Sequence, residues 1–261
     1  MAKSMNKIFV RLLRYLFRTA GIELLQTGRT KAHISFSITC SFKDFNEHFC
    51  FIVDNQHDLI QREHLSGRLY EAEELAVIGR HLAEGATVLD VGANVGNHAI
   101  YFAKCLGAAR VIAVEPGRRQ CRLLRYNVDL NGVEDVVEVH RVALSDHSGT
   151  GTLVLENPWN LGSAHLSYSE AGDEVPLLRG DDLLGEKNID FIKIDAEKHE
   201  MEVLRGLSQI FETCRPPLFV EIETSNAEAF DEWLRHNRYT VAQRHARYSG
   251  IVNILAKPVE A

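Results

Sequence analysis

The sequence predicts an α/β fold built on a mostly parallel sheet that ends in an antiparallel C-terminal hairpin. From residue 87 onward, short β-branched runs alternate with segments of helical spacing, the pattern of parallel strands joined by crossover helices. The last two runs, 239–248 and 250–258, have no helix between them and must therefore pair antiparallel. The length of 261 residues, with 45% hydrophobic and 25% charged residues, suits one large globular domain with an appendage.

The segments before residue 76 predict a small N-terminal extension. Residues 5–20 place apolar side chains on one helical face and most of the basic ones on the other. Residues 33–54 alternate apolar and polar residues around the turn sequence KDFN, which indicates a β-hairpin. We therefore expect residues 1–75 to form a basic amphipathic helix and a β-hairpin, and residues 76–261 to form the main domain.

The main domain is expected to follow a regular order of strands and helices. A helix over 70–82 leads into it. The expected parallel strands are 87–91, 110–116, 136–145, 189–197 and 216–223, and the expected helices are 96–107, 118–132, 199–211 and 226–237. Residues 146–169 are rich in turn residues and interrupt this alternation.

Charge and composition narrow the function classes. The net charge of −7 disfavours general nucleic-acid binding, although residues 1–31 hold seven Lys or Arg against one acidic residue. The helix over 5–20 either docks on protein, on its own domain or a second subunit of a homodimer, or makes peripheral contact with anionic lipid. No apolar run could span a membrane, Arg11 and Arg14 interrupt any signal-peptide core, and five cysteines form no C-x-x-C pair. We expect a cytoplasmic protein, with membrane association through 5–20 as the alternative.

The loop after the first main-domain strand predicts a ligand site. Ligands of open α/β sheets bind outside the carboxyl ends of the strands, and Asp90 ends this one. Gly92 and Gly96 would let a ligand approach the backbone, and the helix starting near Asn97 would offer free N–H groups. Asn94 stands where a dinucleotide fingerprint needs its second glycine, so a pyrophosphate would be crowded.

The acidic residues around this loop favour S-adenosylmethionine as the cofactor. Asp90 suits the ammonium group of that molecule, and the loop amides suit its carboxylate. Glu115, followed by Pro116, ends the second strand, where a carboxylate can accept both ribose hydroxyls. Asp146 either meets the adenine edge or is a surface turn residue. The competing interpretations are an NAD-type oxidoreductase and a module that binds S-adenosylmethionine or a nucleotide without catalysis.

Several segments in order resemble the FkbM family of S-adenosylmethionine-dependent methyltransferases. They are VLDVGANVGNHAIYFAK, VIAVEP, NVDLNG, VALSD and, most specifically, IDFIKIDAEKHEMEVLRG, within about residues 68–225. The resemblance implies a class I methyltransferase Rossmann-like sheet. It also implies O-methylation of a small-molecule or glycan acceptor, at a hydroxyl of a sugar, glycolipid or natural product. The family usually has glycine where this chain has Lys198, which puts the local backbone geometry in question.

The candidate catalytic residues follow the fourth strand. Asp195, Glu197 or His199 would act as a general base on the acceptor hydroxyl. Alternatively, Asp195 with Glu197, Glu221 or Glu223 would hold Mg²⁺, and the metal site is otherwise undetermined. A purely structural alternative makes Glu197 and Glu200 caps of the next helix.

Other residues near the expected site have two interpretations or a structural one. We expect Lys193 to be an ion-pair partner, without a catalytic role. His98 either lines the acceptor pocket or lies on an exposed first helical turn. Trp159 and His165 belong to a loop over the site, where the Trp159 ring either faces a sugar or packs internally.

Overall fold

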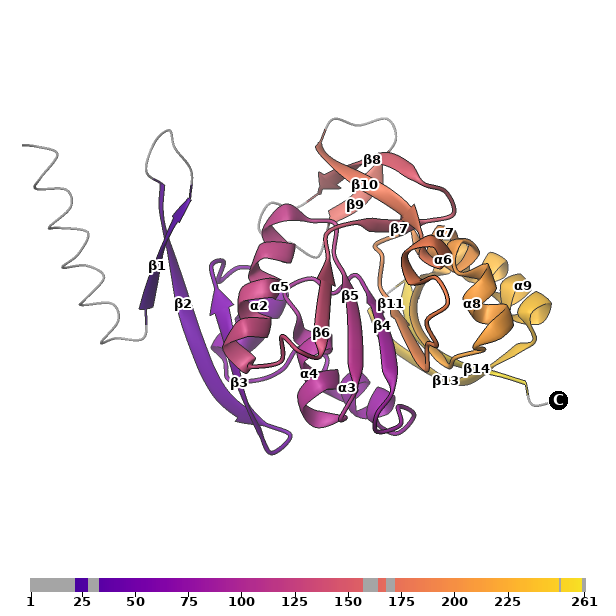
Figure 1. Ribbon diagram of the computed structural model, residues 1–261, viewed down its shortest axis with the longest axis horizontal. Helices are drawn as coiled ribbons and strands as arrows, with labels where there is room; N and C mark the ends of the chain where they lie inside the picture. Colours follow the sequence, from indigo (N-terminus) through magenta and orange to yellow (C-terminus); the bar gives the residue numbers. More distant parts are fainter. Residues whose placement is uncertain (1–21, 28–32, 157–163, 168–171, 249, 260–261) are drawn as a thin grey trace, which may run out of the picture. The chain divides into compact units, whose positions relative to one another are not determined.

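The computed structural model describes residues 22–27, 33–156, 164–167, 172–248 and 250–259 (Figure 1). The helix expected over 5–20 and the side chain of Trp159 lie outside these described residues. The chain divides into two compact units, one ending at Tyr70 and the other starting at Glu71.

The first unit is a three-stranded antiparallel sheet with one helix. Strand β1 (Ile22–Thr27) pairs with β2 (His33–Asp44), which pairs with β3 (Glu47–Val53), and α2 (Leu59–Leu65) follows. The predicted hairpin is thereby confirmed as β2 and β3. The sequence analysis missed β1 and α2. Phe49 and Phe51 are fully buried, and the His64 ring stacks on Phe51 at 3.8 Å, so this unit has a small aromatic core.

The second unit contains a seven-stranded sheet in the order β13-β14-β12-β11-β4-β5-β6 (Figure 1). Its parallel strands are β4 (Thr87–Val91), β5 (Arg110–Val114), β6 (Val137–His140), β11 (Phe191–Ile194) and β12 (Leu218–Glu223). Strands β13 (Tyr239–Tyr248) and β14 (Ile251–Pro258) form the antiparallel end. The predicted fold class, including the C-terminal hairpin, is confirmed.

Helices cover both faces of this sheet. In chain order they are α3 (Ala72–Gly79), α4 (Asn97–Cys105), α5 (Arg118–Asn131), α6 (Gly180–Leu184), α7 (Glu200–Gly206), α8 (Ser208–Thr213) and α9 (Ala227–Asn237). Figure 1 shows α4 and α5 on one side and α7, α8 and α9 on the other. Right-handed crossovers require this split, because the chain moves outward from β4 in one direction and from β11 in the other. Among the described residues, no helix is long and apolar enough to cross a membrane.

A second, four-stranded sheet corrects one expectation. The run 136–145 is not one strand: β6 ends at His140, and β7 (Ala143–Ser145) joins β8 (Gly149–Leu155), β9 (Ala164–Ser167) and β10 (Asp173–Arg179) in the order β7-β10-β8-β9. The turn-rich segment therefore contains strands. Buried apolar residues hold this sheet together; they are Ala143, Val175 and Leu177, with Leu153 and Leu166 packed against them.

Candidate active site

The site lies where the strand order reverses, between β4 and β11. Successive strands run outward from β4 on one side and from β11 on the other, so their carboxyl ends open a crevice. The chain continues from β4 into the loop 92–96, and from β11 into the turn 195–199. Of the predicted site residues, those at 92–97 and 195–199 follow these two neighbouring strand ends, Glu115 and Pro116 follow β5, and Asp146 follows β7.

The two loop glycines are required by packing. Gly92 has φ +76°, and a Cβ there would collide with the main-chain carbonyl of Asp195. Gly96 has φ +96°, and a Cβ there would collide with Leu124. Positive φ and close neighbours already exclude a side chain at both positions. Backbone conformation and packing therefore account for both glycines by themselves, and the approach of a ligand to them stays a prediction.

Lys193 is a buried cation at the junction of the two strand ends. Its Nζ lies 3.4 Å from Asp90 Oδ1 and 3.6 Å from Asp195 Oδ2, and it donates hydrogen bonds to the carbonyls of Val91 (3.3 Å) and Gly92 (3.0 Å). Burial opposes the ammonium ion, but the charges of Asp90 and Asp195 outweigh burial and raise the pKa of Lys193. The ion-pair role expected for Lys193 is confirmed.

Glu115 ties the end of β5 to the loop after β4. Its Oε2 accepts a hydrogen bond from the Asn94 N–H (2.9 Å), and its Oε1 accepts one from the Gly117 N–H (2.7 Å). Burial raises the pKa of Glu115 to about 7, although these two donors favour the charged form. Asn94 adopts φ +49°, and its buried Oδ1 has no partner within the described chain.

One cavity joins these strand ends. The predicted site residues that line it are Gly92, Asn94, Glu115, Pro116, Asp195, Glu197 and His199. The others, Asp90, Gly96, Asn97 and Asp146, are not among its lining residues. Asp90 is fully buried against Lys193, so a direct contact between Asp90 and a cofactor in this cavity does not fit the geometry.

The cavity also has apolar walls that the sequence analysis did not identify. They come from the third-strand region and from the second sheet; the residues are Val142, Ala143, Leu144, Leu153, Ala164 and Leu166. Gln120 of α5 also contributes to the lining. Val142, Ala143 and Leu144 belong to the VALSD motif, although the sequence did not single out their side chains. No motif marks Leu153, Ala164 and Leu166, and only the hydrophobic alternation of β8 and β9 could have suggested them.

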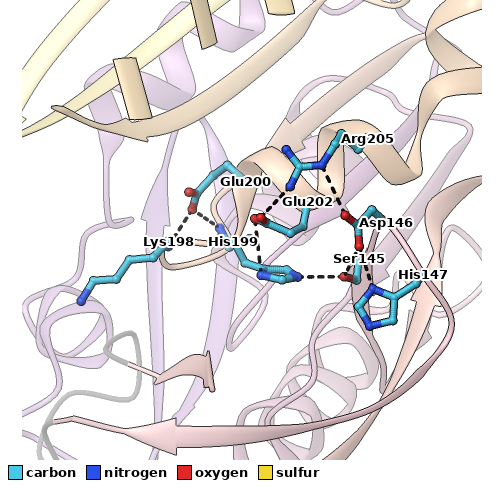
Figure 2. Close-up of polar contacts among 9 residues, drawn as sticks. Ser145, Asp146, His147, Lys198, His199, Glu200, Glu202 and Arg205 are labelled. Atoms are coloured by element: carbon cyan, nitrogen blue, oxygen red, sulfur yellow. Dashed lines mark hydrogen bonds and ion pairs between the residues drawn. The ribbon is translucent and has the colours of Figure 1, made fainter. Parts of the chain in front are cut away.

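The turn from β11 into α7 has an unusual backbone. Glu197 and Lys198 both have positive φ, +48° and +77°. The Glu200 carboxylate holds this turn, because its Oε1 accepts hydrogen bonds from the N–H groups of Ala196 and Lys198, each at 3.1 Å (Figure 2). Glu200 thus holds the turn before α7, and since no side chain of the described residues caps α7, the helix-capping role considered for Glu200 is not observed. Lys198 occupies a conformation that favours glycine.

His199 is held by protein groups at both ring nitrogens. Its Nε2 lies 3.0 Å from Ser145 Oγ and its Nδ1 lies 3.6 Å from Glu202 Oε2, as Figure 2 shows. Burial lowers the pKa of His199, so the neutral ring is favoured. With both nitrogens engaged, His199 is a poorer candidate for the general base than a carboxylate beside it.

Asp146 belongs to a surface network on the far side of Ser145. Its carboxylate lies 2.7 Å from His147 Nδ1 and accepts a hydrogen bond from Arg205 Nε at 3.3 Å (Figure 2). Of the two interpretations of Asp146, the surface role agrees with these contacts.

Three glutamates near the cavity have strongly raised pKa values. Burial, followed by the charges of Asp195 and Glu200, raises the pKa of Glu197 to about 8. Burial, with Asp195 as the largest charge, raises that of Glu221 to about 9, and burial raises that of Glu200 to about 7. Carboxyl groups crowded together in this way cannot all ionise at neutral pH.

A metal centre is not supported. Among the described residues, no group of three or more His, Cys, Asp or Glu side chains could hold a metal ion. The alternative in which Asp195 and its neighbours bind Mg²⁺ therefore has no geometric basis.

The remaining histidines are placed as follows. His98 is 6% exposed, so it is not on an exposed helical turn, and it does not line the cavity. Its Nε2 lies 3.6 Å from Glu71 Oε2. His165 lies on β9, with its Nδ1 3.3 Å from Glu156 Oε1.

Solved structures of similar fold come from several organisms. The FkbM methyltransferase of Methylobacillus flagellatus KT superposes with a TM-score of 0.51 and 17% identity, over 75% of this chain and 52% of that one. A transferase of uncharacterised activity from Pyrococcus horikoshii gives a TM-score of 0.51 and 13% identity, over 95% and 82%. The fold is that of class I methyltransferases.

The sequence comparisons define the family. The family model described as the methyltransferase FkbM domain matches residues 90–241, more than half of the chain. The chain therefore belongs to the FkbM methyltransferase family. The resemblance seen in the motifs is confirmed, and membership implies S-adenosylmethionine as the methyl donor.

Curated relatives cover the chain only in part. Hexuronic acid methyltransferase AglP of Haloferax volcanii is 26% identical over 167 residues, 62% of this chain and 66% of that protein. Ribosomal protein L11 methyltransferase of Thermotoga maritima is 34% identical over 131 residues, which cover 48% of this chain and 47% of that protein. AMB antimetabolite synthetase AmbE of Pseudomonas aeruginosa is 25% identical over 235 residues, which cover 72% of this chain and 11% of that protein. The chain thus spans less than two thirds of each of these proteins.

Proposed function

We propose that the chain binds S-adenosylmethionine in the cavity at the β4–β11 switch point and transfers its methyl group to a hydroxyl of a sugar or related acceptor. The observation that carries this proposal is the convergence of Glu115, Asp195 and Glu197 on one cavity. The name of the Haloferax volcanii relative supports a sugar acceptor.

The lining residues fit the two ends of the cofactor. Each oxygen of Glu115 accepts one backbone hydrogen bond and keeps a lone pair for a ribose hydroxyl. The apolar wall around Leu144, Leu153 and Leu166 suits an adenine ring. Asp195, whose side chain is 33% exposed, borders the cavity together with Glu115 and Glu197, while Asp90 is buried beside Lys193 and does not line it.

Glu197 and Asp195 then have different roles in methyl transfer. Bound S-adenosylmethionine supplies a methyl group on a positively charged sulfur, and transfer needs the acceptor oxygen in line with that bond. Glu197 takes the proton that the acceptor hydroxyl loses as its oxygen bonds to the methyl carbon. Asp195, held by Lys193, orients the hydroxyl. A carboxylate whose pKa is near 8 is a stronger base than an ordinary glutamate, which suits a weakly acidic hydroxyl.

Glu197→Gln tests this assignment. Since only ionised Glu197 accepts the proton, turnover by the wild type should rise with pH through about 8. The variant should lose about 100-fold or more in kcat without weaker binding of S-adenosylhomocysteine. The assay follows label from S-adenosylmethionine into glycan and small-molecule fractions of a cell extract, with the exposed Glu212→Gln as control. Full activity and an unchanged pH profile in Glu197→Gln would remove Glu197 from the mechanism.

A further inference from the structure

The hairpin β8–β9 forms one apolar side of the cavity. Leu153 of β8 and Ala164 and Leu166 of β9 line it. Across the cavity lie Glu197 and His199 of the turn that follows β11. The width of the cavity therefore depends on how this hairpin is held relative to the turn 195–199.

A side-chain contact joins the β8–β9 hairpin to the turn 195–199. Lys198 Nζ donates a hydrogen bond to Glu156 Oε1 at 2.9 Å, and Glu156 directly follows β8. His165 Nδ1, on β9, lies 3.3 Å from the same oxygen. In Figure 2 the Lys198 side chain points away from the His199 network, so this contact is separate from the hydrogen bonds around Ser145. Their hydrogen bond, and then their opposite charges, raise the pKa of Lys198 and lower that of Glu156.

The backbone fixes the direction of Lys198. Its φ is +77°, and Glu200 Oε1 accepts a hydrogen bond from its N–H. A lysine in the left-handed region is strained, and strained residues of this kind persist where the surrounding structure or a function requires them. At Lys198 the strained backbone coincides with an ammonium group that donates a hydrogen bond to Glu156.

We propose that Lys198 is a positioning residue that, through Glu156, holds the β8–β9 hairpin against the turn 195–199 and slows the release of the bound nucleoside. The consequence for release rests on the proposed cofactor binding. The side chains of Lys198 and Glu156 are 50% and 51% exposed, so we expect this ion pair to change the rate of nucleoside release only modestly.

The test measures how fast S-adenosylhomocysteine dissociates from the full chain in stopped-flow experiments. Lys198→Met and Glu156→Gln should each raise the rate about 2- to 5-fold, the range expected for an exposed ion pair. The double variant should be no faster than either single one, because both remove the same contact. Lys198→Arg should retain the wild-type rate. Wild-type rates in Lys198→Met, or effects that multiply in the double variant, would overturn the proposal.

A control and a second readout keep the two proposals separate. Arg244→Met removes an ion pair of similar exposure, with Asp231, between β13 and α9, and should leave dissociation unchanged. If the wild type binds no S-adenosylhomocysteine, the proposed cofactor site fails. Hydrogen exchange at the amides of Ala164–Ser167 then still tests the hairpin. Faster exchange in Lys198→Met than in Arg244→Met supports the positioning role, and equal exchange overturns it.

Discussion

Lys193 compensates the buried negative charge of Asp90 at the end of β4. The register of the parallel pair β11–β4 sets Lys193 opposite Asp90, and Asp195 follows two residues later. Asp90 is fully buried, so its carboxylate depends on the cation 3.4 Å away. The sequence could suggest an ion pair from the alternation of Lys193 and Asp195, but not Asp90 as partner, because that pairing requires the strand order.

Lys193→Met should therefore destabilise the fold severely. It leaves Asp90 as an uncompensated buried charge, for which a loss of about 3–5 kcal/mol is typical. The measurement is urea unfolding at pH 7. Lys187→Met is the control, since Lys187 Nζ donates a hydrogen bond to the Leu184 carbonyl at 3.3 Å, and its loss should cost less than about 1 kcal/mol. Equal losses in both variants would show that the Asp90 charge does not depend on Lys193.

Lys198 carries a cost in stability that glycine would avoid. At φ +77°, replacement by glycine should relieve roughly 1 kcal/mol of backbone strain. Because Lys198→Gly also removes the contact with Glu156, the comparison is with Lys198→Met, which loses the contact but keeps the strain. We expect Lys198→Gly to be the more stable variant by thermal unfolding. A lower Tm for Lys198→Gly would mean that the turn does not strain its lysine.

At the scale of elements, the ends of β11 and β12 bring several carboxyl groups together. Asp195 and Glu197 follow β11, and Glu221 lies near the end of β12. Burial, and then the charge of Asp195, favours the protonated forms of Glu197 and Glu221. This part of the site could be located from the sequence, since strand ends were recognisable, but not its protonation, which depends on spacing in the fold.

The pH dependence of stability should show this crowding. The pKa of Glu221 in the fold is about 9, above its ordinary value of 4.5, so its contribution is full below pH 4.5 and is lost as pH rises through about 9. Glu221→Gln cannot ionise and should exceed the wild type in stability at pH 9, on the order of a few kcal/mol, but not at pH 5. Urea unfolding at pH 5, 7 and 9 measures the difference.

Glu223→Gln is the matched control for that series. Glu223 lies two residues further along the same strand, is not fully buried and accepts a hydrogen bond from Ser225. Its variant should follow the wild type at every pH. A stability gain at pH 9 that is equal in both variants would indicate general charge reduction, and the specific role of Glu221 would be lost.

The four-stranded sheet shows where element prediction from sequence fails. Segment 149–155 reads GTGTLVL, and its small residues give no clear alternation until the last positions. Strand β10 lies between β7 and β8, pairing parallel with β7 and antiparallel with β8, while β9 pairs with the other edge of β8. Tertiary pairing of this kind decides short strands more than local preference does.

At the scale of the whole molecule, the main sheet was predictable because its strands are buried on both faces. Val88, Leu89, Val111 and Ile112 are almost completely inaccessible, which explains the continuous apolar runs. The position of the cavity could also be predicted from the sequence, since ligands of such sheets bind at the switch in strand order. The different roles of Asp90 and Asp195 could not be predicted, because only the packed structure distinguishes a buried carboxylate from one that borders the cavity.

Isothermal titration of the full chain with S-adenosylhomocysteine, and separately with NAD, tests the central claim most directly. The account predicts one binding site for S-adenosylhomocysteine, with affinity strongly reduced by Glu115→Ala, which removes the carboxylate expected to hold the ribose. It predicts no comparable binding of NAD, because Asn94 occupies the space that a pyrophosphate would need. Binding of NAD without binding of S-adenosylhomocysteine would contradict it.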